Sequence, residues 1–181
     1  MSDMIQKAER QLVLPLDREQ QATIFNPPAP VEMRADVHAY PRLKTLGDAA
    51  LPGMVAIVLR AMVYRGQKAN DEDAALTAAN LLDELIADRD KLRTDLLCLS
   101  EIWYAVRKAV LGQRKDGKEM YGVNVASLYM AITDYVRNEG RDAHKMAEER
   151  RRKATSPSAV ETRIAAAAGE FGRKARQATH L

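Results

Sequence analysis

Cysteine and aromatic residues are scarce in this chain. Among its 181 residues there are one cysteine, Cys98, one tryptophan and two phenylalanines. A single cysteine excludes an internal disulfide framework and a cysteine-based zinc site. Because Cys98 lies among leucines, we expect a small buried apolar side chain rather than a reactive thiol. The lack of disulfides fits a reducing compartment, so we expect a cytoplasmic protein.

The motifs of common enzymes and membrane proteins are also missing. The sequence has no GxxxxGK[ST] phosphate loop, no GxGxxG after a strand and no HExxH zinc motif. His38, His144 and His180 lie in segments that we expect outside the core, away from a serine or cysteine nucleophile. No apolar run approaches the roughly 20 residues that cross a bilayer, and no signal peptide is recognisable. We therefore expect a non-enzymatic protein without a cofactor, a metal or a membrane.

Helical periodicity is the main positive signal. Apolar residues make up 46% of the chain, with alanine and leucine dominant and few β-branched runs, which predicts an all-α protein. Apolar residues at steps of three and four predict helices over 51–64, 71–87, 94–111 and 124–136. Together these helices predict a compact four-helix unit over residues 41–140.

The helix predicted over 94–111 carries the clearest apolar face. Leu99, Trp103 and Val106 recur on one side, and a face of this strength must be buried against at least two other helices. Its opposite side, which we expect to face solvent, presents Glu101, Tyr104, Arg107 and Lys108.

Residues 1–40 are predicted to be a flexible tether. Pro27, Pro28 and Pro30 interrupt a helix and impose extended backbone on the residues before them. Within this tether, residues 11–16 form the apolar hexapeptide QLVLPL.

That hexapeptide resembles the segments through which bacterial replication and repair proteins bind the sliding clamp, which read Gln-Leu-x-Leu-x-Leu or end in Phe. The resemblance implies that Gln11 enters a small polar pocket while Leu14 and Leu16 enter an apolar one. An extended peptide presents such anchors at low ordering cost. Alternatively, Leu12, Leu14 and Leu16 fold back onto the protein's own core.

The C-terminal segment 141–181 is predicted to be a basic helical tail. From residue 137 onward there are eleven Lys and Arg against six Asp and Glu, a balance of +5 in a chain of net charge +3. Large apolar residues are rare there, so 137–154 is predicted to project as a charged helix that ends before Pro157, with Glu148 and Glu149 paired to cations one turn later. A polyanion would be attracted to Arg150, Arg151, Arg152 and Lys153. The alternative is a tail that only increases solubility.

A second cationic cluster surrounds the turn 112–122. It consists of Arg107, Lys108, Arg114, Lys115 and Lys118. With Tyr104 and Tyr121 beside them, these cations suit phosphate contacts and a stacked base. A solvated polar rim explains the same residues and is the favoured interpretation.

Residues 158–172 are predicted to form one more short helix. Residues 158–161 match a capping box, and Val160, Ile164 and Phe171 follow on a narrow apolar stripe. The stripe is too small to fold alone, so it either docks on the body or enters a partner's groove.

Residues 40–143 resemble a family of small helical proteins of unknown function encoded by Bacteroidetes genomes and their phages and mobile elements. The resemblance runs through YPRLKTL at 40–46, the helix holding Leu76 and Ile86, Leu92 with the aromatic-bearing helix after it, and Tyr121-Gly122. The family has a shorter cationic turn before Tyr-Gly. The layout also resembles that of phage helicase loaders, which pair a helical domain with a partner-binding tail.

These observations predict a non-enzymatic accessory protein of DNA replication in a phage or mobile element. Its tails are expected to bind a protein such as a clamp or helicase, and its cations to bind nucleic acid without sequence preference. The main alternative is a structural or assembly protein that self-associates through its long C-terminal helix. A toxin-neutralising regulator is a third interpretation, with no specific residue behind it.

Overall fold

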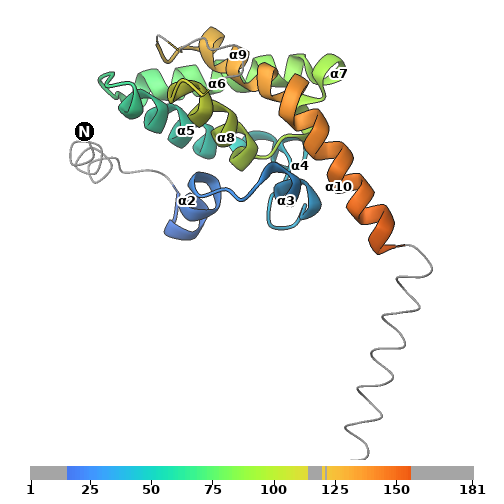
Figure 1. Ribbon diagram of the computed structural model, residues 1–181. Coiled ribbons are helices and arrows are strands. Elements are labelled where there is room, and N and C mark those ends of the chain that lie inside the picture. Colours follow the sequence, from blue (N-terminus) through green and yellow to red (C-terminus); the bar gives the residue numbers. More distant parts are fainter. Residues whose placement is uncertain (1–15, 114–119, 121, 156–181) are drawn as a thin grey trace, which may run out of the picture.

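The computed structural model describes residues 16–113, 120 and 122–155, and this part of the chain is all-α, as predicted (Figure 1). In chain order its helices are α2 (Arg18–Phe25), α3 (Pro30–Ala35), α4 (Leu43–Leu46), η1 (Gly47–Ala50), α5 (Leu51–Tyr64), α6 (Asp71–Ala87), α7 (Arg89–Leu92), η2 (Thr94–Leu96), α8 (Leu99–Val110), α9 (Val125–Tyr135), η3 (Val136–Gly140) and α10 (Arg141–Ala154). Here η1 and η2 are 3-10 helices, and η3 is a π-helical segment. Extended pairing within these residues is limited to an isolated bridge between Arg42 and Cys98.

The helices predicted for the body are present and form the core. α5 packs against α6 and α8, and α9 packs against the same two helices (Figure 1). Met54, Ile57 and Val58 of α5 are fully buried, as their spacing predicts. Asn70 and Asn124 cap α6 and α9 through their side chains, which confirms both predicted helix starts.

The stretch Leu43–Tyr64 is more apolar than expected. It is a helical run of 22 residues, and an 18-residue part of it has a mean hydropathy of 1.6, so it could cross a membrane by length and composition alone. Half of that 18-residue part is buried inside the fold, and α5, the main part of the run, contacts both α6 and α8. A helix that is apolar on most sides is also what the core of a compact protein requires.

The N-terminal segment differs from the predicted tether. α2 and α3 are both helical, and Ile24, Phe25 and Met33 are buried. Pro30 is compatible with this fold because it occupies the first turn of α3, where a helix has no use for its missing N–H. The start of α2 is fixed by a capping box between Asp17 and Gln20.

Trp103 explains why this segment docks. Its ring meets Phe25 edge to face, with 5.1 Å between the centroids, and its indole N–H donates to the Phe25 carbonyl oxygen at 3.2 Å. Only 1% of Trp103 is exposed, so the predicted burial is confirmed. The Arg60 guanidinium lies 4.4 Å from the Phe25 centroid and covers that ring.

α8 begins later than predicted. Thr94 is buried within η2, and its hydroxyl donates to the Leu85 carbonyl oxygen, so it does not cap α8. Cys98 is the N-cap residue instead, and its N–H donates to Glu101 Oε2 at 3.3 Å. The prediction that Glu101 faces solvent is wrong, because its side chain is completely buried. Its carboxylate is held inside the fold by Arg34, Arg42 and Tyr135, which apolar periodicity does not reveal.

α6 is rotated slightly from the orientation that its apolar spacing predicts, which is an inward face of Ala75, Ala78, Leu82, Leu85 and Ile86. Ala78, Leu82 and Leu85 are buried, whereas Ala75 is exposed, Ile86 is 43% exposed, and Leu81 is buried in their place. Alanine and leucine occur on several sides of this helix, so periodicity alone leaves its rotation loosely defined.

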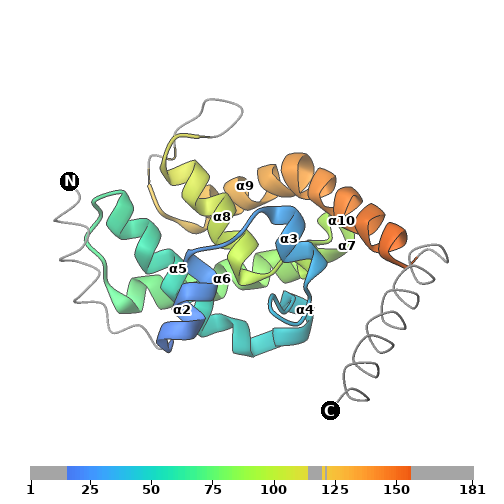
Figure 2. The same cartoon turned by 60° about the horizontal axis from the view of Figure 1, so that its bottom comes forward.

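The C-terminal helix is packed over part of its length, unlike the projecting helix predicted. α9, η3 and α10 follow one another directly, and α10 lies against α3 (Figure 2). The small side chains of Ala143 and Ala147 allow this approach and are buried. α10 ends at Ala154, in agreement with the predicted stop before Pro157.

The contact between Phe25 and Trp103 gives a test of the docked N-terminal segment. We expect Phe25→Ala and Trp103→Ala each to lower the free energy of unfolding by about 3–5 kcal/mol, because each empties a closed apolar site. The double variant should lose less than the sum, since the rings touch. Val37→Ala, at a position that is 50% exposed, should stay within about 0.5 kcal/mol. Urea unfolding followed by circular dichroism measures all four, and a Phe25→Ala variant as stable as Val37→Ala would contradict the docking.

Candidate anion-binding site

Glu101 is the charged centre of the fold. Arg34 Nε lies 2.6 Å from Oε1 of Glu101, and Arg42 Nη1 lies 3.1 Å from Oε2. The Tyr135 hydroxyl also donates to Oε1, at 2.8 Å. With the Cys98 N–H on Oε2, both carboxylate oxygens are occupied. The cluster therefore ties α3, the segment before α4, α8 and the end of α9 to one buried anion.

This cluster holds more positive than negative charge. Two guanidiniums, with side chains 9% and 10% exposed, share one carboxylate, which leaves a balance of about one positive charge. Arg42 also donates to the Met33 carbonyl oxygen at 3.0 Å. Among the described residues Arg34 donates only through Nε, although a guanidinium has five N–H donors. The terminal nitrogens of Arg34 are thus available to a ligand.

Arg34 lines a pocket of about 320 Å³, and the titratable side chains that the structure describes in its lining are all basic. Its walls come from α3, from the turn between α7 and η2, from η3 and from α10. The basic side chains that line it are Arg34, Lys91, Arg93, Arg137, Arg141, His144 and Lys145. Leu92, Leu96 and Val136 add an apolar part. A concave surface lined by one sign of charge concentrates the electrostatic potential, so this pocket favours an anion.

Arg93 is held in an unusual backbone conformation. Its φ of 53° makes it the sole non-glycine residue with positive φ in the described part of the chain. Arg93 ends α7, a position where glycine or asparagine is usual, and a larger residue there costs roughly 1 kcal/mol or more. Such strain concentrates at functional sites, and here it places a guanidinium on the pocket wall.

The π-helical segment η3 shapes the opposite wall. π-helical turns often occur at functional sites, and Gly140 closes this one. A Cβ on Gly140 would lie 3.3 Å from the Tyr135 ring and 3.5 Å from Arg34 Nη2, so the missing side chain makes room for both. Beyond it, Arg141 and Lys145 follow Arg137 at four-residue steps and share one side of the helix.

Most of the pocket's cations are not neutralised within the described part of the protein. Lys91 lies 3.5 Å from Asp88 and is largely exposed, so this pair is weak. Arg93, Arg137, Arg141 and Lys145 form no ion pair with a carboxylate that the structure describes. Counted over the described side chains, the pocket therefore keeps a positive surplus.

The pKa of His144 is sensitive to the positive charge of the pocket. Burial lowers the pKa of His144 below its usual value, and the charges of Arg34 and Arg93 lower it further. Glu148, 4.0 Å away, opposes this shift. The imidazole is therefore mainly neutral at neutral pH. A negative charge bound in the pocket would raise its pKa.

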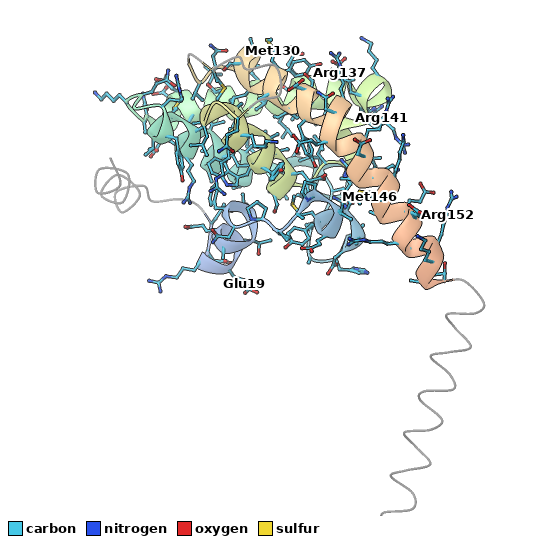
Figure 3. The ribbon with its side chains drawn as sticks, in the orientation of Figure 1. Glu19, Met130, Arg137, Arg141, Met146 and Arg152 are labelled. Carbon is cyan, nitrogen blue, oxygen red and sulfur yellow. The ribbon has the colours of Figure 1, made fainter. Side chains whose placement is uncertain are left out.

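The positive surface continues from the pocket along α10. Arg137, Arg141 and Arg152 follow one another along η3 and α10 (Figure 3). The predicted pairs Glu148–Arg152, at 2.9 Å, and Glu149–Lys153, at 3.2 Å, are confirmed. Arg150 and Arg151 are exposed and form no pair with a described carboxylate, so they carry the surplus charge at this end.

The remaining predicted site residues are placed elsewhere or lie outside the described residues. Arg107 is exposed on α8, and Lys108 Nζ pairs with Glu139 Oε1 at 2.5 Å, so Lys108 is partly neutralised. Leu16 is half-buried against the core, in line with the fold-back alternative for that residue. The residues outside the described part are Gln11, Leu12, Leu14, Arg114, Lys115, Lys118, Val160, Ile164 and Phe171.

Sequence reasoning missed most of the pocket. Arg34 fell in the supposed tether, and Arg93 gave no signal because arginine is not typical of a left-handed position. The spacing of Arg137, Arg141 and Lys145 at four-residue steps did carry a signal for one basic helix side. What the spacing could not show is that this side faces Arg34 and Arg93.

The described residues give no support to a reactive thiol or to a metal site. Cys98 is 1% exposed, and burial first, then the charge of Glu101, raises its pKa to about 12, so it stays a protonated thiol at neutral pH. Its predicted burial is confirmed. Among the described residues, no group of three or more His, Cys, Asp or Glu side chains is arranged to hold a metal ion.

Comparison with protein-family models, with curated proteins and with solved structures finds no match for this chain.

The buried Glu101 cluster predicts a large difference between two matched substitutions. Glu101→Gln removes the anion that two buried guanidiniums share, so we expect a loss of about 3–5 kcal/mol in the free energy of unfolding. Glu139 is the control, because it also accepts from a cation and a tyrosine, Lys108 and Tyr104, but is partly exposed. Glu139→Gln should cost about 1 kcal/mol or less. Equal urea midpoints for the two variants would refute the central role of Glu101.

The backbone of Arg93 predicts opposite stability effects for two neighbouring substitutions. Arg93→Gly should raise the free energy of unfolding by roughly 1 kcal/mol, because glycine adopts positive φ without strain. Lys91→Gly also removes one pocket cation, but it lies within α7, where glycine should cost up to about 1 kcal/mol. Thermal melting at fixed salt measures both. If Arg93→Gly is destabilising, the left-handed residue is not strained.

Proposed function

We propose that this protein is a non-enzymatic accessory factor that binds nucleic acid through its basic pocket and the adjoining side of α10. The observation that carries the proposal is the surplus of cations running from the pocket to the end of α10, with Arg141, Lys145 and Arg151 between them. Phosphate groups are the repeating anions that such a surface fits, and contacts to them carry no sequence information.

The dimensions of α10 are compatible with a phosphate backbone. Its 14 residues span about 21 Å at a rise of about 1.5 Å per residue, the length of roughly six base pairs at 3.4 Å each. About four phosphate contacts over that length predict a slope near −3.6 in a plot of log binding constant against log salt. Affinity should therefore be modest at moderate salt and steeply dependent on it.

The proposed setting is DNA replication in a phage or mobile element. The clamp-binding resemblance of residues 11–16 and the apolar stripe that the sequence predicts for 158–172 support protein partners, such as a clamp or helicase, for the two ends of the chain. In such an arrangement the helical body holds nucleic acid while the ends hold the replication protein. Partner capture with and without Gln11→Ala and Leu14→Ala tests this part separately.

Self-association through the C-terminal helix is the less favoured alternative. The alanines that would form a close helix seam, Ala143 and Ala147, already pack against α3. Met146 is the large apolar side chain of α10 that remains exposed, at 50%, and one side chain gives little area for a stable dimer. Sedimentation over a range of concentrations discriminates, because an assembly protein should associate with itself.

Fluorescence anisotropy with labelled DNA tests the proposed function. We expect binding to single-stranded and duplex DNA of unrelated sequences with similar affinity, weakening about 50-fold for the single strand and about 150-fold for the duplex between 50 and 200 mM salt, as about four phosphate contacts require. The variant Arg141→Gln/Arg151→Gln should reduce both the affinity and the salt slope, because it removes two phosphate contacts.

The matched control is Arg18→Gln/Lys68→Gln, which makes the same change in net charge at exposed positions in α2 and before α6. It should leave the slope unchanged. If both double variants weaken binding equally, net charge rather than this surface governs it, and if salt has no effect the phosphate contacts do not exist.

A further inference from the structure

The pocket between α3, α7 and α10 differs from the surface of α10 in having a recessed cation. Arg34 is more than nine-tenths buried, is fixed through Nε on Glu101, and still lines the pocket. Its remaining N–H donors have no acceptor among the described residues. A guanidinium fixed in this way is oriented in advance, so a ligand that reaches it loses little to side-chain ordering.

The pocket and the exposed side of α10 suit different kinds of phosphate group. A phosphodiester carries one negative charge and continues as a chain on both sides, which fits the open side of α10. A terminal phosphate has three free oxygens and a charge of about −1.5 to −2 at neutral pH, as phosphate monoesters do. It can enter end-on and accept from several guanidiniums at once. Arg34, Arg93 and Arg137 converge on the pocket from three different elements and supply those donors.

The pocket also has space and apolar surface for more than the phosphate. Its volume of about 320 Å³ is at the lower end of the range for small-molecule sites. Leu92, Leu96 and Val136 line it beside the cations. Such side chains pack against a sugar or the face of a base, whereas an inorganic anion would leave them uncovered.

We propose that this pocket binds a nucleoside phosphomonoester, with the phosphate at Arg34, Arg93 and Arg137 and the sugar or base against Leu92, Leu96 and Val136. Its source as the 5′-phosphate at the end of a DNA strand rests on the proposed function. A free mononucleotide presents the same chemistry and is the other source. The side of α10 holds the following phosphodiesters when the ligand is a strand end.

Binding of three ligands to the full chain at moderate salt tests the inference. They are an oligonucleotide with a 5′-phosphate, the same oligonucleotide with a 5′-hydroxyl, and deoxyadenosine 5′-monophosphate. We expect the phosphorylated strand to bind about tenfold tighter than the hydroxyl strand, because its phosphate adds a charge-assisted hydrogen bond to the largely buried guanidinium of Arg34. The mononucleotide should compete for that difference and leave the hydroxyl strand bound.

Two single variants at exposed positions localise the effect. Arg137→Gln removes a pocket donor, so the ratio of the two strand affinities should fall towards one. Arg151→Gln makes the same chemical change outside the pocket, so it should weaken both strands and leave the ratio unchanged. Both side chains are exposed, so neither substitution is expected to disturb folding.

His144 gives a readout that is independent of affinity. Nuclear magnetic resonance of the imidazole, assigned with His144→Gln, should show its pKa rising when the mononucleotide saturates the pocket, because the bound dianion offsets the positive charges around it. Arg34 on α3, Arg93 after α7, and Arg151 with Glu148 on α10 are the charged groups that act on this ring. His38 lines a different pocket and should not respond.

The outcomes separate this inference from the proposed function. Equal affinity for the two strands, with no effect of the mononucleotide on His144, overturns the pocket assignment and leaves nucleic-acid binding by α10 intact. If the mononucleotide binds and shifts His144 but neither strand binds, the pocket assignment stands and the proposed function fails. Strand preference without binding of the mononucleotide identifies the strand end as the ligand. A ratio unaffected by Arg137→Gln places the ligand elsewhere and overturns the inference.

Discussion

The buried carboxylate of Glu101 is the interaction on which the other packing depends. Two guanidiniums, a phenol and a backbone N–H from separate elements converge on it. A buried charge is tolerated only when it is paired and hydrogen-bonded. The elements that carry these four groups must therefore all be packed together for Glu101 to be buried. This requirement holds the short helix α3 against the C-terminal half of the fold, although α3 itself has only six residues.

The same requirement connects the interior to the surface. The cluster contains two arginines and one carboxylate, so one positive charge is not neutralised within it. Arg34, which also lines the pocket, places that charge on the pocket wall. Additional cations then come from a turn with a strained backbone and from a π-helical segment, a rare kind of turn that is frequent at functional sites. The excess arginine, the positive φ of Arg93 and the π-helical segment all lie at the same pocket. This coincidence is the main reason to assign a ligand there.

Sequence periodicity predicted the part of the fold that depends on apolar burial. α5, α6, α8 and α9 were found from it because steps of three and four residues map directly onto a helix face. Glu101 and Arg34 were not, since hydropathy assigns every charged residue to solvent and cannot represent two charges that satisfy each other. The prolines near α3 suggested a tether for a similar reason, because Pro30 is compatible with a helix start and only the buried Met33 reveals docking. The pocket depends on such long-range pairing.

The π-helical segment η3 has a consequence for the direction in which α10 faces. A π-helical turn contains about one residue more than an α-helical turn. If the five residues of η3 took α-helical geometry instead, every residue after them would be rotated by about 100°, the turn of one α-helical residue. Ala143 and Ala147 would then leave α3, and Arg141 and Lys145 would leave the pocket. The orientation of the basic surface is therefore determined by the backbone geometry of η3 as much as by the residues of α10.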